Sequence, residues 1–283
     1  MKLLVFGKSG QVATELRRQA DVVALSRADA DLTDPDACAA IIAATEADAI
    51  INAAAYTGVD AAEADEAAAH TVNAEAPGAM AEAAAKRDLP FLHISTDYVF
   101  DGGGTEPWPV DAPTAPLGAY GRTKRAGEEA VRNAGGRHAI LRTSWVFSAH
   151  GNNFVKTMLR LGKERDALTI VADQIGGPTA AADIAHALLQ MAEAFHSGHD
   201  KTGTYHFAGA PDASWANFAR EIFAQAGMST AVTDIPTTQF PTPAERPKNS
   251  RLDCTTTEIA FGLKRPDWRQ SLGTVLKELG EVA

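Results

Sequence analysis

The first apolar run of the chain leads straight into a glycine turn, LLVFGKSGQVA (Leu3–Ala13). The run is typical of a buried strand, and a helix-like segment follows the turn. At such a junction Gly7 and Gly10 let the backbone approach a pyrophosphate, which the helix N-terminus then binds through its N–H groups and dipole. A P-loop has a glycine, four further residues and then a Gly-Lys-Ser/Thr triplet. The triplet is missing at that spacing, so the turn is not a P-loop. It predicts a dinucleotide site; a tight turn without a ligand is the alternative.

Further short apolar runs continue this pattern, with helix-like stretches between them. They lie at 22–25, 49–51, 91–94 and 139–141. Buried parallel strands read as continuous apolar runs, so the alternation predicts an α/β fold with a doubly wound parallel sheet. Beyond residue 145 the pattern loosens, and we expect strands at 168–172 and 203–207, helices at 152–162, 180–195, 214–226 and from 266, and a proline-rich loop at 237–249.

These segments predict two lobes. Residues 1–150 form the dinucleotide-binding domain, with 168–200 interleaved into it. Residues 151–167 and 201–283 form a smaller α/β C-terminal lobe that binds the substrate. The boundary follows the point at which the regular alternation ends.

Composition excludes several classes of protein. With 36 acidic and 26 basic residues the net charge is −10, which argues against a nucleic-acid or anionic-membrane binder. We expect the acidic excess on helices such as 60–82, away from the site. Cys38 and Cys254 are predicted to be free thiols in a reducing compartment. No apolar run approaches about 18 residues and no signal peptide is recognised, so the sequence predicts a cytoplasmic protein.

The end of the second strand bears on the cofactor. Ser26 and Arg27 stand where an acidic residue would favour NAD, and an arginine there suits the 2′-phosphate of NADPH; a plain surface arginine is the alternative. The acidic run 29–34 superficially suggests a calcium loop, but it lacks the loop glycine and the closing glutamate. It predicts a turn with a helix cap at Thr33 or Asp34, and Asp31 near the adenine.

Tyr120 and Lys124 lie one helical turn apart, on one face of a predicted helix. A lysine ammonium near a phenol is expected to lower the pKa of the tyrosine, which then exchanges a proton with a carbonyl or alcohol oxygen. The hydroxyl of Thr96, at the end of the fourth strand, would complete a clamp on that oxygen. Alone the Y-x-x-x-K spacing is common, but it gains weight after a dinucleotide turn. His93 is interpreted as a core histidine.

Taken together, these residues resemble the extended short-chain dehydrogenase/reductases, and more narrowly the dTDP-4-dehydrorhamnose reductases. The resemblance spans nearly the whole chain and implies a Rossmann-type sheet. Its blocks are 6–12, 52–57, 95–100, 120–124, 142–146, 151–154, 173–174 and 241–252. Two positions depart from related motifs, because Ala13 replaces a frequent glycine and Ser26-Arg27 replaces an acidic residue.

The resemblance implies reduction of the C4 keto group of dTDP-4-dehydro-L-rhamnose to dTDP-L-rhamnose by NADPH or NADH. Tyr120 would protonate the alkoxide, Lys124 would hold the nicotinamide ribose, and Thr96 would orient the carbonyl. Cofactor contacts would also come from Gly7, Gly10, Gln11, Val12, Ser26, Arg27, Asp31, Leu32, Ala55, Tyr56 and Thr57. The substrate side would comprise Asp97, Tyr98, Trp145, Asn153, Arg246 and Arg251, the arginines being assigned from their charge.

Several alternatives stay open at this point. The fold would also serve reduction or epimerisation of another 4-keto-6-deoxy sugar nucleotide, or a non-catalytic regulatory subunit. Some related enzymes use magnesium, but the sequence offers no acidic cluster for it, and no metal ligand is predicted. A homodimer is compatible with the sequence, which does not specify the oligomeric state.

Overall fold

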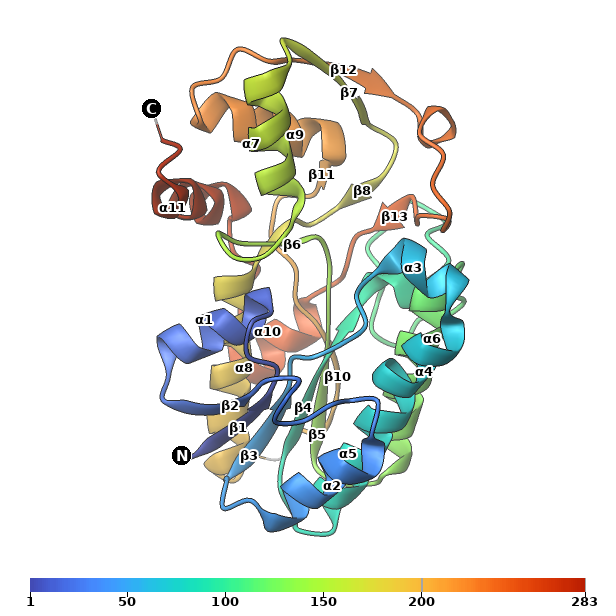
Figure 1. Cartoon of the computed structure of the whole chain (residues 1–283), viewed down its shortest axis with the longest axis vertical. Coiled ribbons are helices and arrows are strands. Elements are labelled where there is room, and N and C mark those ends of the chain that lie inside the picture. The colour runs from blue at the N-terminus through green and yellow to red at the C-terminus, as the bar shows by residue number, and fades with distance from the viewer. Residues whose placement is uncertain (200, 283) are drawn as a thin grey trace.

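A six-stranded parallel sheet forms the base of the molecule in the computed structural model, which describes residues 1–199 and 201–282 (Figure 1). Asp200 and Ala283, which end two predicted lobe ranges, lie outside these residues. The sheet order is β10-β5-β4-β3-β1-β2. The strands are β1 (Leu3–Phe6), β2 (Val22–Leu25), β3 (Ala49–Asn52), β4 (Phe91–Thr96), β5 (His138–Thr143) and β10 (Gly203–His206). The order reverses between β1 and β3, where wound sheets bind ligands.

Helices cover both faces of this sheet and bury its apolar strands (Figure 1). On one face lie α1 (Gln11–Gln19), α8 (Ala181–His196) and α10 (Thr255–Phe261). On the other lie α2 (Pro35–Ala44), α5 (Ala76–Ala85) and α6 (Ala119–Asn133). Asp34 caps α2 by accepting a hydrogen bond from Ala37 N, as the turn at 29–34 predicted. The predicted doubly wound α/β sheet is confirmed.

Helix α6 approaches its neighbours closely because it contains glycines at two contacts. A Cβ atom on Gly127 would lie 2.0 Å from the backbone oxygen of Asn73, in the π-helical turn η1 (Thr71–Glu75). A Cβ on Gly121 would lie 2.2 Å from the backbone oxygen of Tyr98, in the short helix η2 (Asp97–Val99). Both distances are far below van der Waals contact, so only glycine lets α6 pack here.

A buried ion pair ties α6 to the sheet. Glu128 accepts hydrogen bonds from Arg142 Nε and Nη2 at 2.8 and 2.6 Å, and from Ser95 Oγ at 2.6 Å. Burial alone would raise the pKa of Glu128, but the charge and hydrogen bonds of Arg142 outweigh it and hold that pKa below its ordinary value. Because these side chains come from α6, β5 and β4, the pair fixes the helix relative to both strands.

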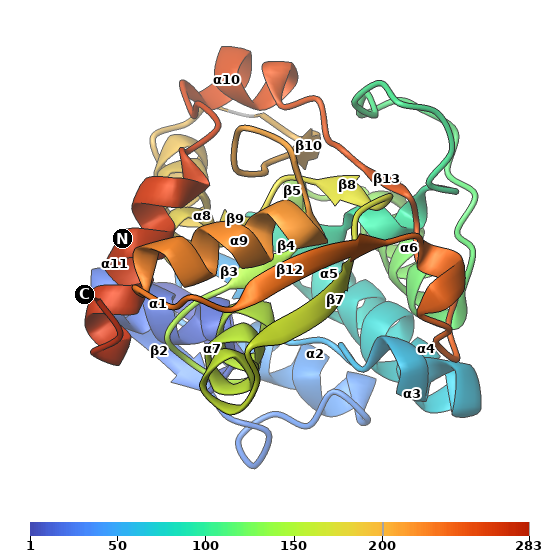
Figure 2. The same cartoon turned by 90° about the horizontal axis from the view of Figure 1, so that it is seen from above.

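The second lobe lies above the carboxyl ends of the strands in Figure 1 and is seen from above in Figure 2; it is made of small sheets and helices. Its helices are α7 (Phe154–Glu164), α9 (Trp215–Gln225) and α11 (Trp268–Leu279), which share one apolar core. Its strands are β6 (Val146–Phe147), β7 (Ala167–Val171), β8 (Ile175–Gly176), β9 (Thr179–Ala180), β11 (Ala213–Ser214), β12 (Ala231–Ile235) and β13 (Asn249–Ser250). Ser214 caps α9, as its sequence predicted.

Several segments belong to other lobes than the sequence predicted. Helix α10, predicted in the substrate lobe, packs on the large sheet, and strands β6, β8 and β9, predicted in the dinucleotide domain, belong to the small sheets of the second lobe. Strand β10, predicted in the substrate lobe, pairs with β5 at the edge of the large sheet. Strand β7, predicted in the dinucleotide domain, pairs with β12. Apolar runs indicate strands but not their partners, and this chain crosses between the lobes more than once. Cys38 and Cys254 are both buried free thiols, as predicted.

Replacement of Glu128 by glutamine is expected to lower the free energy of unfolding by about 3 kcal/mol, because it leaves the buried Arg142 guanidinium without its carboxylate. The matched control is Glu129→Gln, which removes only an exposed i,i+4 pair with Arg125 and should cost less than about 0.5 kcal/mol. Denaturant unfolding followed by circular dichroism measures both. Equal losses in the two variants would contradict the role given to the buried pair.

Candidate active site

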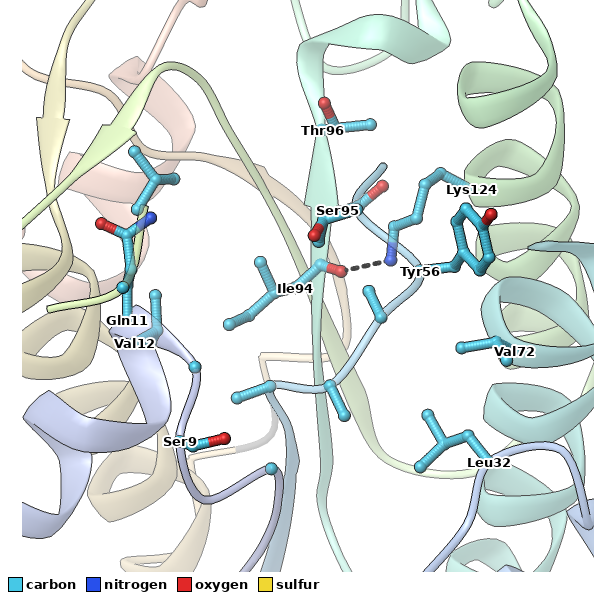
Figure 3. Close-up of a pocket in the computed structure, with 18 of the residues that line it drawn as sticks. Ser9, Gln11, Val12, Leu32, Tyr56, Val72, Ile94, Ser95, Thr96 and Lys124 are labelled. Atoms are coloured by element: carbon cyan, nitrogen blue, oxygen red, sulfur yellow. Dashed lines mark hydrogen bonds between the residues drawn. The ribbon is translucent and has the colours of Figure 1, made fainter. Parts of the chain in front are cut away.

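One cavity of about 880 Å³ opens at the carboxyl ends of β1 and β3 (Figure 3). The glycine turn, the ends of β2, β3 and β4, and helix α6 all contribute to its wall. The structure brings most of the predicted site residues together here. These are Gly7, Gly10, Gln11, Val12, Ser26, Arg27, Asp31, Leu32, Ala55, Tyr56, Thr57, Thr96, Asp97, Tyr98, Tyr120, Lys124 and Trp145.

The glycine turn has the geometry that a pyrophosphate needs. Gly7 has a φ of +111°, and a Cβ there would lie 3.3 Å from the backbone of Ala53. Gly10 begins α1 without any side-chain cap, and a Cβ on it would meet nothing within 4 Å. The first N–H groups of α1 therefore face open space at the positive end of the helix dipole. A nicotinamide dinucleotide fits this turn.

The end of β2 places Ser26 and Arg27 at the rim of the same cavity. The Arg27 side chain is 79% exposed and its Nε lies 3.2 Å from Asp31 Oδ2. Ser26 Oγ donates to Asp29 at 2.6 Å. An exposed pair of this kind is weak, so a phosphate bound at the rim would compete readily with Asp31 for the guanidinium.

Lys124 projects from α6 into the cavity wall and is almost fully buried. Its Nζ donates to the Ile94 carbonyl oxygen at 2.7 Å, drawn in Figure 3, and lies 3.2 Å from His93 Nε2. Asn52 Nδ2 in turn lies 3.2 Å from His93 Nδ1. Burial lowers the pKa of Lys124 to about 8. His93 is the core histidine that its sequence indicated, but its contact with Lys124 was not predicted.

Tyr120 lies one turn before Lys124 and is partly buried beside Thr96. Burial raises the pKa of Tyr120 to about 12, although a hydrogen bond with Thr96 favours the phenolate. The sequence predicted the opposite direction, with Lys124 lowering this pKa; here the Lys124 ammonium group is bound to Ile94 instead. A raised pKa keeps the phenol protonated at neutral pH, which suits a proton donor.

Thr143 is a residue of the cavity wall that the sequence analysis did not single out. It ends β5 as Thr96 ends β4, and the strand register pairs the two directly. Its hydroxyl is buried and has no hydrogen-bond partner among the described residues. The signal available in the sequence was its position, because the last residue of a parallel strand faces the ligand crevice.

Trp145, also on the cavity wall, stacks on Trp215 from the second lobe with ring centroids 3.6 Å apart. Its φ is +49°, a left-handed conformation that is uncommon for a bulky residue. Because β6 starts directly after Trp145, this turn sends the chain from the large sheet into the second lobe. Trp145 therefore forms the cavity wall where the two lobes meet.

Three predicted substrate residues do not line the cavity. Asn153 caps α7 and donates to Gln11 Oε1 at 3.0 Å. Arg246 forms an ion pair with Asp60 at 2.8 Å. Arg251 donates to Asn249 Oδ1 at 3.0 Å. The expectation that the acidic helices lie away from the site is wrong for Asp60, because its carboxylate pairs with Arg246, a predicted substrate residue.

Within the residues that the structure describes, one group of side chains has the spacing of a metal site. Glu15, His150 and Glu278 bring their ligand atoms within 4.8 Å of one another, but Arg18 lies among them and donates to Glu278. The sequence did not indicate this group because its members are far apart along the chain. No described helix combines the length and the apolar character needed to cross a membrane.

The sheet, the glycine turn and the Thr96, Tyr120 and Lys124 cluster define a class of protein: the extended short-chain dehydrogenase/reductases, which are nicotinamide-dependent oxidoreductases. The sequence profile described as RmlD substrate binding domain matches residues 1–281, and the chain belongs to that family. This is the family of the dTDP-4-dehydrorhamnose reductases.

Individual relatives agree with this assignment. The dTDP-4-dehydrorhamnose reductase of Sinorhizobium fredii is 44% identical over 96% of this chain and 95% of its own length. A crystal structure of a dTDP-4-dehydrorhamnose reductase from Clostridium acetobutylicum superposes with a TM-score of 0.92, at 36% identity, over 99% of this chain and 100% of that one. The enzyme from Bacillus anthracis, in complex with NADP, also gives 0.92, at 33% identity, over 98% and 99% of the two chains.

The lowered pKa of Lys124 makes stability depend on pH. A lysine whose folded-state pKa lies below its unfolded value destabilises the fold while it is charged, and this cost fades as pH rises from about 8 towards the ordinary lysine value of 10.5. Wild-type stability is therefore expected to rise by about 2–3 kcal/mol relative to Lys124→Met over that range. Denaturant unfolding from pH 7 to 10.5 measures the difference.

Lys277→Met is the matched control, since Lys277 lies on the outside of α11. The stability of Lys277→Met should follow the wild-type dependence on pH over the whole range. Parallel curves for wild type and Lys124→Met would contradict the burial of a charged lysine.

Proposed function

We propose that this chain reduces the C4 keto group of dTDP-4-dehydro-L-rhamnose to the alcohol of dTDP-L-rhamnose, with NADPH as the reductant. The observation that carries the proposal is the position of Tyr120, Thr96 and Lys124 on the wall of one cavity with an uncapped glycine turn. Membership of the dTDP-4-dehydrorhamnose reductases supports the choice of sugar nucleotide.

In this proposal the residues of the chain bind the substrate, orient its C4 keto group and protonate its C4 oxygen. NADPH, when bound, supplies the hydride. Tyr120 gives its phenolic proton to the C4 oxygen, and its raised pKa keeps that proton in place until negative charge develops. Thr96 orients the same oxygen through its hydroxyl.

Lys124 holds the nicotinamide ribose in this proposal. Its Nζ already lies in the cavity wall, where it donates to the Ile94 carbonyl oxygen and contacts His93 Nε2. An ammonium group donates three hydrogen bonds, so it can keep the Ile94 carbonyl while it binds ribose hydroxyls. Its position one helical turn from Tyr120 then fixes the ribose relative to the acid.

The cofactor and the sugar are assigned to opposite ends of the cavity. The glycine turn with Gln11 and Val12, together with Leu32 and residues 55–57, would contact the dinucleotide, and Asp97, Tyr98 and Trp145 would contact the sugar. Arg27 would bind the adenosine 2′-phosphate. The NADP in the Bacillus anthracis structure supports this cofactor. We further propose that the large sheet carries the cofactor and the second lobe the nucleotide end of the substrate, and that the enzyme works in the cytoplasm.

The deciding experiment is NADPH oxidation by the purified chain, with the 4-keto sugar nucleotide generated in situ and the product identified by mass and NMR. We expect stoichiometric formation of dTDP-L-rhamnose. Oxidation only with another 4-keto-6-deoxy sugar nucleotide would move the substrate assignment. No oxidation with any of them would favour a regulatory protein that binds nucleotide without turnover.

Replacement of Tyr120 by phenylalanine should lower the reduction rate by at least about 100-fold, because general acid catalysis contributes about that much. NADPH affinity should stay within about twofold, since the ring and its packing against Tyr98 are kept. Stopped-flow absorbance gives the rate, and fluorescence titration gives the affinity. A variant that reduces the sugar at the wild-type rate would show that another group is the acid.

Replacement of Arg27 by alanine should weaken NADPH binding about tenfold, the cost of a lost charge-assisted hydrogen bond, and should leave NADH unaffected. Isothermal titration with both cofactors measures the two affinities. Arg125→Ala, which removes an exposed arginine of α6, is the matched control. Equal losses for NADPH and NADH would rule out a contact with the 2′-phosphate.

A further inference from the structure

Asp97 presents a buried carboxyl group to the sugar end of the cavity. It directly follows Thr96 at the end of β4, and it is only 2% exposed. Its Oδ1 lies 3.1 Å from Thr96 Oγ1. Its Oδ2 is buried without a hydrogen-bond partner among the described residues. An ionised carboxylate in this position would leave one charged oxygen unsatisfied, which is costly in a buried site.

The surroundings of Asp97 favour its neutral form. Burial raises the pKa of Asp97 to about 6, although the hydroxyls of Ser250 and Thr96 favour the charge. The titratable groups that interact with it are the phenols of Tyr98 and Tyr120, and Arg246, which acts on Tyr98, is paired with Asp60. In the part of the chain that the structure describes, no cationic side chain forms an ion pair with Asp97.

The protonation state of Asp97 decides where the hydroxyl proton of Thr96 can point. The hydroxyl has one proton and two lone pairs. One lone pair accepts the backbone N–H of Tyr98 at 3.2 Å. If Asp97 is ionised, the single Thr96 proton points at Asp97 Oδ1, so Thr96 can only accept in its hydrogen bond with Tyr120 and presents no proton to the cavity. If Asp97 is protonated on Oδ1, its O–H fills the second lone pair of Thr96, and the Thr96 proton is free to point towards Tyr120 and the cavity.

We propose that Asp97 is a positioning residue which, in its protonated form, donates to Thr96 Oγ1 and so directs the Thr96 hydroxyl proton at the C4 oxygen of the sugar. This inference rests on the proposed function. The developing alkoxide then meets two donors, the phenol of Tyr120 and the hydroxyl of Thr96. Donors aimed at the place where charge develops stabilise the transition state. Asp97 itself gives up no proton in the reaction.

The sign of the pH dependence follows directly. Reduction is fast while Asp97 holds its proton and slows as pH rises through the pKa of that carboxyl group. Above this point each further pH unit removes about nine-tenths of the protonated form, so the rate falls by up to about tenfold per unit. It levels off at the rate that Tyr120 supports alone.

The test is the single-turnover rate of NADPH oxidation between pH 5.5 and 8.5, which product release cannot mask. Wild type is expected to show the falling limb. Asp97→Asn is expected to show none, changing less than about threefold, because the amide N–H₂ donates to Thr96 at every pH. Asp101→Asn, an exposed aspartate four residues along the chain, should keep the wild-type profile.

A second variant tests the proposal even if Asp97→Asn does not fold. Thr96→Val removes the hydroxyl but keeps the shape of the side chain. It should lower the rate at pH 5.5 at least tenfold and abolish the falling limb, because no proton is left to direct. A Thr96→Val enzyme that keeps the limb would overturn the proposal.

A measurement without substrate separates this inference from the proposed function. The ¹³C carboxyl resonance that is missing in Asp97→Asn should titrate near pH 6 in the wild-type chain. Wild type that oxidises no NADPH with any 4-keto sugar nucleotide contradicts the proposed function. An active wild type with a flat profile contradicts the role of Asp97, and so does an Asp97→Asn enzyme that binds NADPH yet is inactive at every pH.

Discussion

The close packing of α6 on η2 and η1 is the constraint on which the site depends. Gly121 and Gly127 let the helix approach to distances that no side chain would allow, and the buried Glu128–Arg142 pair fixes it against β5. This approach brings Tyr120 beside Thr96 and pushes Lys124 into the cavity wall. Burial then sets the chemistry, because it keeps Tyr120 protonated and lowers the proton affinity of Lys124.

The charge of the molecule and the charge of the site differ in sign. The chain carries a net charge of −10, yet its ligands are phosphorylated anions. The uncapped N-terminus of α1 and the rim guanidinium of Arg27 supply local positive potential at the cofactor end. Arg246 and Arg251 lie outside the cavity wall and are partnered, so the second lobe would have to release or share these cations to bind a diphosphate. The acidic excess therefore concerns solubility more than binding.

The sequence predicted those parts of the fold and site that depend on local pattern. The glycine turn, the strand runs and the Tyr120–Lys124 spacing report the backbone and one helix face, and the structure places them as predicted. The prediction from sequence failed where the outcome depends on strand pairing or on burial. Strand β10 joins the large sheet, and Thr143 reaches the cavity through its register with Thr96. The pKa of Tyr120 was predicted in the wrong direction because spacing gives proximity to Lys124 but not burial. The contact between His93 and Lys124 was not predicted for the same reason.

The central claim is that one cavity holds both ligands and presents Tyr120 and Thr96 to the same oxygen. A crystal structure of the chain with NADP⁺ and dTDP-L-rhamnose tests it most directly. The account predicts Tyr120 Oη and Thr96 Oγ1 within hydrogen-bond distance, about 3 Å, of the sugar C4 oxygen, with Lys124 Nζ on the nicotinamide ribose. A sugar whose C4 oxygen contacts neither hydroxyl, or a cofactor bound away from the glycine turn, would contradict it.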